Sequence, residues 1–116
     1  MASLNGLPAL LDFSVYGGDN FTVQINFVDG TTNNPWPLTG TWKAEIRTTP
    51  TATSPVTSFT IDTSQGAAGI LYMSLTGTQT TLLIGSPFVW DLQQTVSGSV
   101  KTFYTGHIRA VKDVTL

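Results

Sequence analysis

The sequence predicts an all-β protein: an immunoglobulin-like antiparallel sandwich of about seven strands that follows an N-terminal arm. Three observations support this fold class. Apolar and polar residues alternate in several short segments, the pattern of strands with one buried face. Turn-forming residues separate these segments at spacings of roughly 8–12 residues. With 116 residues, 41% of them hydrophobic, the chain is long enough for one domain with its own core.

The first 18 residues differ from the rest, so we expect an arm over residues 1–18 and the sandwich over residues 19–116. The alternation in the arm is weak, because the turn residues Asn5, Gly6 and Pro8 interrupt it. Two interpretations stay open: the arm packs on its own sheet, or it reaches a neighbouring copy as an exchanged strand. An exchanged strand would bury Leu4, Leu7, Leu10 and Leu11, and these residues together with Trp36 in a later loop form a hypothetical assembly interface.

The two clearest strands come next along the chain. In residues 21–27 aromatic and β-branched residues alternate with Thr, Gln and Asn, which predicts a strand with one buried face. In residues 42–47 the apolar residues share one face, and Lys43, Glu45 and Arg47 share the other. Confinement of charge to one side is typical of an antiparallel strand whose outer face meets water.

The middle of the chain holds shorter elements. Residues 48–55 are rich in Thr and Pro and predict a loop. Residues 56–61 and 70–75 predict two short strands on either side of a polar turn. Residues 79–84 break the β pattern and predict one helical turn, which a following Gly and Pro would end.

The last third predicts a hairpin. Residues 88–93 alternate, residues 96–100 form a Gly- and Ser-containing turn, and Phe103 to Val111 form the final strand. An immunoglobulin-type sandwich is favoured over a small barrel because Trp42 falls on the third strand, where such folds bury an indole. The chain has no cysteine, so the disulfide of that fold is absent.

The composition restricts the possible functions. Charged residues make up 10% of the chain, and the polar surface comes instead from 20 threonines and 9 serines. Self-repulsion between copies is therefore weak, which favours a surface that neighbours cover; a Thr-rich sandwich that is sparing with charge is the alternative. Five scattered basic residues cannot form a nucleic-acid surface, and no segment is apolar for long enough to span a membrane or act as a secretion signal.

The sequence offers no recognisable catalytic, metal or cofactor site, so we expect no enzyme and no cofactor. His107 is the only histidine, and no Gly-x-Ser-x-Gly elbow accompanies it. The carboxylates occur singly, without the spacing of a calcium loop. We expect Asp19, Asp29 and Asp62 to cap the backbone of turns.

Two aromatic residues are candidates for binding. Trp36 lies in a polar loop between Pro35 and Pro37, where its indole could meet a sugar or a protein. The alternative is that the prolines hold this indole over one end of the core. Tyr16 is a second possible stacking platform for a sugar.

A set of short motifs is spread over residues 13–115. They are Gly18-Asp19-Asn20-Phe21, Asp29-Gly30, Leu38-Thr39-Gly40-Thr41-Trp42-Lys43-Ala44-Glu45-Ile46-Arg47, Gly69-Ile70, Gln79-Thr80, Val89-Trp90-Asp91-Leu92-Gln93, Gly106-His107-Ile108 and Asp113-Val114-Thr115. In this order they resemble the N-terminal module of bacteriophage baseplate upper proteins and stand-alone relatives encoded near tail fibre genes. The most specific part is Leu-Thr-Gly followed by the alternating strand.

The resemblance implies an immunoglobulin-like sandwich without catalytic activity, located in the virion and bound to other virion proteins and to copies of itself. The sequence ends at Leu116, just after the module, so we expect an adaptor or fibre-anchoring subunit of the tail or baseplate. A capsid decoration protein is the first alternative. A carbohydrate-binding module, with a host-surface glycan as partner, is the second.

Overall fold

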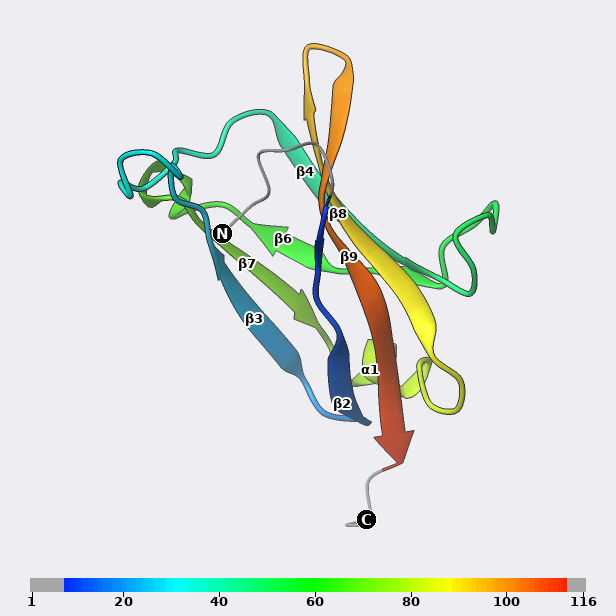
Figure 1. The fold of residues 1–116 in the computed structure, drawn as a ribbon. Helices are drawn as coiled ribbons and strands as arrows, with labels where there is room; N and C mark the ends of the chain where they lie inside the picture. The colour runs from blue at the N-terminus through cyan, green and yellow to red at the C-terminus, as the bar shows by residue number, and fades with distance from the viewer. Residues whose placement is uncertain (1–7, 113–116) are drawn as a thin grey trace.

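The computed structural model describes residues 8–112, which form two β-sheets packed face to face. Sheet A has the order β1-β9-β8-β4-β5, and β2 also pairs with β9; sheet B has the order β3-β7-β6. The strands of sheet A are β1 (Ala9–Leu10), β2 (Phe13–Gly17), β4 (Thr41–Arg47), β5 (Thr57–Ser58), β8 (Phe88–Val96) and β9 (Ser99–Lys112). Those of sheet B are β3 (Phe21–Asn26), β6 (Thr60–Asp62) and β7 (Ile70–Leu75). Figure 1 shows the two layers and the β8–β9 hairpin that projects beyond them.

The fold class predicted from the sequence is confirmed. Two separate sheets exclude the small barrel, and their strand orders follow the two sheets of an immunoglobulin domain, with β3, β7 and β6 opposite β9, β8, β4 and β5. Trp42 on β4 is 8% exposed, and its ring centroid lies 5.3 Å from those of both Phe27 and Phe103. The indole therefore occupies the core position that the fold predicts for it.

The core lies between the inward faces of the two sheets. Sheet B contributes alternate residues such as Leu71 and Met73, which are fully buried. On sheet A the β8–β9 pairing shifts register between Leu92 and Gln93, so β9 has one extra residue there. This bulge lets the consecutive residues Phe103 and Tyr104 both lie in the core.

The segment expected as an N-terminal arm belongs, as far as the structure describes it, to sheet A. β1 and β2 run parallel to β9, with Ala9 opposite Tyr104 and Phe13 opposite Ile108. The interpretation that the arm packs on its own sheet describes residues 9–17 correctly. The boundary at residue 18 falls in the turn between β2 in sheet A and β3 in sheet B.

The strand predicted over residues 56–61 is divided between the two sheets. β5 pairs with β4 in sheet A, and β6 pairs with β7 in sheet B. Phe59 lies between them, 5% exposed, and its amide donates to the Ala44 carbonyl at 2.9 Å. The chain passes from sheet A to sheet B at Phe59, and burial of its ring between the sheets explains why a single predicted strand is divided between them. Residues 8–112 form nine strands. If β1 and β2 are counted as one interrupted strand, and β5 and β6 as another, the number is seven, in agreement with the prediction of about seven.

The predicted helical turn is present but begins earlier. Helix α1 spans Gly77–Thr81 instead of residues 79–84, because Thr76 and Gln79 form a capping box at its start. The Gln79 side chain also donates to the Ser58 carbonyl at 2.7 Å and so connects α1 to β5. The predicted β8–β9 hairpin closes through Ser97 and Gly98, which both have positive φ.

Candidate interaction surface

The outer face of sheet A carries four charged side chains close together. We call this area the charged face, and its residues are Lys43, Glu45 and Arg47 on β4 and Asp91 on β8, with the uncharged Val89 and Gln93 beside them. The residues are arranged in three rows across the strands, because alternate residues of a strand share a face. Lys43 lies opposite Gln93, Glu45 opposite Asp91, and Arg47 opposite Val89. The side chains along β4 thus alternate between positive, negative and positive charge.

Arg47 is fixed by two strong contacts. Its guanidinium donates to the Glu45 carboxylate at 2.8 Å and to the Ala52 carbonyl at 2.8 Å. These bonds connect β4 to the loop over residues 48–55. Lys43, in contrast, is 62% exposed, and its Nζ lies 3.9 Å from Glu45. Lys43 is therefore the cation on this face that is held most loosely.

Asp91 occupies the centre of the charged face without a hydrogen-bond donor among the described residues. Burial raises the pKa of its carboxyl, and the neighbouring Glu45 raises it further, while Arg47 and Lys43 act in the opposite direction. A partly buried carboxylate beside a second carboxylate is best satisfied by an added cation or N–H donor.

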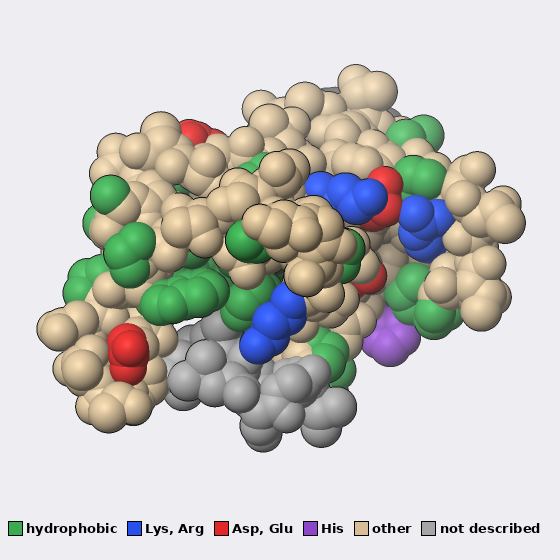
Figure 2. Space-filling view, turned by 90° about the horizontal axis from the view of Figure 1, so that it is seen from above, with side chains coloured by type: hydrophobic (Ala, Val, Ile, Leu, Met, Phe, Trp, Pro, Cys, Tyr) green, Lys and Arg blue, Asp and Glu red, His purple; other side chains and the backbone are tan. Residues whose placement is uncertain are grey.

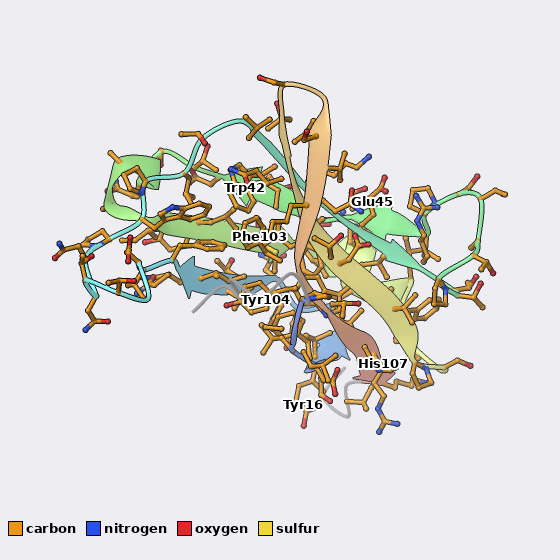
Figure 3. The ribbon with its side chains drawn as sticks, turned by 45° about the horizontal axis from the view of Figure 1, so that its top comes forward. Tyr16, Trp42, Glu45, Phe103, Tyr104 and His107 are labelled. Atoms are coloured by element: carbon orange, nitrogen blue, oxygen red, sulfur yellow. The ribbon has the colours of Figure 1, made fainter. Side chains whose placement is uncertain are left out.

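A hollow of about 300 Å³ opens at this carboxylate. It is lined by the charged Glu45, Arg47 and Asp91, by His107 at one margin, and by the apolar Leu10, Pro50 and Val89. Figure 2 shows Lys or Arg side chains beside Asp or Glu side chains on one part of the surface, with the histidine and hydrophobic side chains nearby. In Figure 3, Glu45 and His107 lie over sheet A, while Trp42 and Phe103 lie between the sheets.

The N-terminal strands form the margin of the hollow, and a part-buried side-chain hydrogen bond adds to their pairing with β9. The indole N–H of Trp90 donates to the Leu11 carbonyl at 2.8 Å. Gly106 makes this approach possible, since a Cβ at that position would lie 2.0 Å from the same carbonyl oxygen. Leu11 packs partly against the core, whereas Leu10 is 81% exposed. The contact therefore presents the Leu10 side chain outward at a fixed position.

The residues of the hypothetical assembly interface have different positions. Leu4 and Leu7 lie outside the described residues, and Leu10 and Leu11 are placed as above. Trp36 is partly buried against Phe27 and Phe103, with ring centroids 6.0 and 5.7 Å away. The structure thus separates Trp36, which covers one end of the core, from the leucines at the sheet margin.

The turn-capping role expected for the aspartates is present at two of the three positions. The Asp29 carboxylate accepts from the amides of Thr31 and Thr32, and that of Asp62 accepts from the Ser64 amide at 2.8 Å. No side-chain hydrogen bond of this kind involves Asp19 among the described residues. At Asp19 it is the main-chain carbonyl that accepts, from the buried Thr80 hydroxyl at 2.9 Å.

His107 and Asp12 form an exposed pair. The Asp12 carboxylate accepts from the His107 amide at 2.8 Å and lies 3.8 Å from its imidazole Nδ1. Over residues 8–112, no cluster of three or more metal-ligating side chains occurs. No helix within the same residues has the length and apolar character needed to cross a membrane.

The spacing of residues 42–47 predicts the outward charges of this strand, but it does not predict the central pair of Glu45 and Asp91. Asp91 becomes important only through its register with Glu45, and a local pattern does not reveal which strands pair. The outward charge of Asp91 in an otherwise alternating strand is the signal that the sequence offers for this residue.

No protein-family model matches the chain, and a search of curated proteins finds no similar sequence.

Proposed function

We propose that this protein is a non-enzymatic structural subunit of a bacteriophage virion, an adaptor of the tail or baseplate or an anchor for its fibres, present in several copies. The observation that carries the proposal is the fixed presentation of Leu10. Leu10 is 81% exposed on a strand anchored through Leu11 to the buried Trp90, and it lines one hollow with the apolar Pro50 and Val89, so a covering subunit would bury a small apolar patch there.

The rest of the described surface is consistent with a role in assembly. It is rich in hydroxyl groups and poor in charge, so copies repel one another little. Assembly proteins act in many copies, and individually modest contacts gain strength through multivalency. The resemblance to phage baseplate modules points to the same class of protein.

Immunogold labelling of purified particles from the source of this chain tests the proposal. We expect an antibody against the protein to label the tail or its fibres. Label spread over the head would instead assign it to the decoration proteins, and the tail proposal would be wrong. Absence of label from particles, both intact and disrupted, would contradict both virion roles.

A carbohydrate-binding module is the second candidate, because the Tyr16 ring is 54% exposed and can stack on a sugar. A glycan array with wild type and Tyr16→Ala tests it. Binding that is lost in the variant would favour this candidate, whereas a lack of binding to host glycans would remove it. Trp36→Ala is a less suitable probe, because that ring also packs on the core.

Leu10→Asp tests the surface that carries the proposal. Leu10 is exposed, so the fold should be unchanged, and incorporation into particles should fall about tenfold or more if the side chain is covered there. Val100→Asp is the matched control, since Val100 is 60% exposed at the hairpin away from this margin. Equal incorporation of both variants and wild type would contradict a role for Leu10.

A further inference from the structure

The charged face has a charge pattern that is complementary to itself. Two cations, Lys43 and Arg47, and two anions, Glu45 and Asp91, balance to zero, so neither a strongly acidic nor a strongly basic partner is favoured. The charges alternate along β4 at a repeat of about 7 Å, the distance between residues i and i+2 of a strand. A copy shifted by one row therefore brings unlike charges together.

A two-fold axis that lies between two such faces produces this shift. If the axis runs across the strands between the row of Lys43 and the row of Glu45, the first row of one copy lies over the second row of the other. Lys43 then meets the Glu45–Asp91 pair of the second copy, and Gln93 lies over Asp91. Because the arrangement is isologous, each contact occurs twice.

The state of the side chains suits this arrangement. Lys43 is 62% exposed and only loosely engaged with Glu45, so it can reach across the interface. Asp91 lacks a hydrogen-bond donor among the described residues, and its hollow is open to the outside. The amide of Gln93 and the ammonium of Lys43 are the donors that such a carboxylate requires.

We propose that the charged face of sheet A is the surface through which two copies of this chain pair, with Lys43 of each copy over the Glu45–Asp91 pair of the other. The pairing deepens the proposed function, which requires several copies, and it can be tested without particles. Contacts between opposite charges that remain accessible to water are weakened by salt. We therefore expect a modest dimer that dissociates as the ionic strength rises.

Reciprocal charge reversal gives the decisive test, measured by sedimentation velocity at low and high salt. Lys43→Glu and Asp91→Lys each place like charges at both symmetric contacts, so each variant alone should associate about tenfold or more weakly than wild type. An equimolar mixture of the two should associate more strongly than either variant alone, because Lys43 of the Asp91→Lys chain then meets the unchanged Glu45–Asp91 pair of the Lys43→Glu chain, and the two introduced side chains become unlike neighbours. Asp62→Lys, the same substitution on sheet B, is the control and should associate as wild type does.

The outcomes separate this inference from the proposed function. A wild-type protein that stays monomeric at low salt and high concentration, or a mixture that associates no more strongly than either variant alone, would overturn the pairing. Circular dichroism of each variant checks the fold. If Asp91→Lys does not fold, Lys43→Gln replaces it as a second single variant, which should weaken association less than Lys43→Glu does. Label on particles without self-association would leave the virion role intact, and self-association without label would leave the pairing intact.

Discussion

The two outer faces of the sandwich are built from the same kind of strand and yet differ in chemistry. Sheet A presents two cations and two carboxylates around a hollow. Sheet B presents small polar groups, such as Gln24 and Asn26, whose side chains hydrogen-bond to each other at 2.9 Å. Charge is therefore distributed unevenly over the two outer faces, because Lys43, Glu45, Arg47 and Asp91 are grouped on sheet A.

The average composition of the chain conceals this difference between the two faces. A hydroxyl-rich face such as that of sheet B tolerates contact with many surfaces but selects none of them. A face with alternating charges favours one registration over its neighbours, because a shift by one row turns attraction into repulsion. Substitutions on the two sheets should therefore differ in their effects on stability and on self-association.

The largest effect on stability is expected from Gly106→Ala, which pushes the chain at Leu11 away from β9. The new Cβ would lie 2.0 Å from the Leu11 carbonyl oxygen, so β1 must move and the free energy of unfolding should fall by about 3 kcal/mol. Chemical denaturation measures the loss. Gly18→Ala is the control, since nothing lies near its Cβ and only its positive φ opposes the change. An equal loss in both variants would contradict the close approach at Gly106.

A smaller loss is expected from Trp90→Phe, which removes the donor to Leu11. The part-buried Leu11 carbonyl loses its donor and the core loses volume, so the free energy of unfolding should fall by ~2 kcal/mol. Trp42→Phe is matched, because its indole also donates to a backbone carbonyl, that of Thr39, at 3.0 Å. Only Trp90→Phe should accelerate hydrogen exchange of the Leu11 amide. The anchoring role would be wrong if both variants left that amide protected.

One aspartate on each sheet should contribute to the free energy of unfolding with opposite dependence on pH. Burial raises the pKa of Asp91 on sheet A, so the folded state holds its proton longer than the unfolded chain. Its contribution to the free energy of unfolding is then present at low pH and is lost as the pH rises from the ordinary value, 3.8, through the raised pKa. We expect Asp91→Asn to remove this loss.

Asp62, at the end of β6 in sheet B, provides the opposite case. The hydrogen bond from the Ser64 amide lowers the pKa of its carboxyl, so its contribution is present above 3.8 and is lost as the pH falls through the lowered pKa. Asp62→Asn should remove that loss. Thermal unfolding of wild type and both variants between acidic and neutral pH gives the change in Tm caused by each substitution as a function of pH. If this change had the same sign of pH dependence for both substitutions, the opposite pKa shifts of Asp91 and Asp62 would be wrong.

The smallest effect on stability is expected from single truncations on each face. Gln24→Ala removes an exposed hydrogen bond on sheet B, and Lys43→Ala removes a loose ion pair on sheet A. Each should change the free energy of unfolding by less than about 0.5 kcal/mol. Their difference should appear in self-association, which Lys43→Ala weakens and Gln24→Ala leaves unchanged. Equal association would show that the faces do not differ in the way proposed.

The sequence predicts the local elements of this fold better than their partners. Residues 42–47 and 70–75 form strands as expected, because each has a clean alternation of buried and exposed residues. The parallel pairing of β2 with β9 could not be predicted, since the two strands are separated by most of the chain. The crossing at Phe59 has the same cause: an apolar residue predicts burial but not which sheet its neighbours join.

The candidate surface follows the same rule. Lys43, Glu45 and Arg47 share a face through spacing alone, and the sequence predicts this correctly. The position of Asp91 beside Glu45 depends on strand register, and that of Leu10 depends on the close approach at Gly106. Pairing between strands that are distant in the chain is therefore the information that alternation lacks.

The parallel pairing at the margin of sheet A has a mechanical consequence. β2 and β9 run side by side in the same direction, with five residue pairs from Phe13–Ile108 to Gly17–Lys112. A pull on the first strand at Ala9 and an opposite pull at Lys112 would slide the two strands along each other. The bonds of the ladder would then bear the load together, whereas a hairpin pulled from its open end breaks them one after another. We expect the sandwich to resist stretching between these two points.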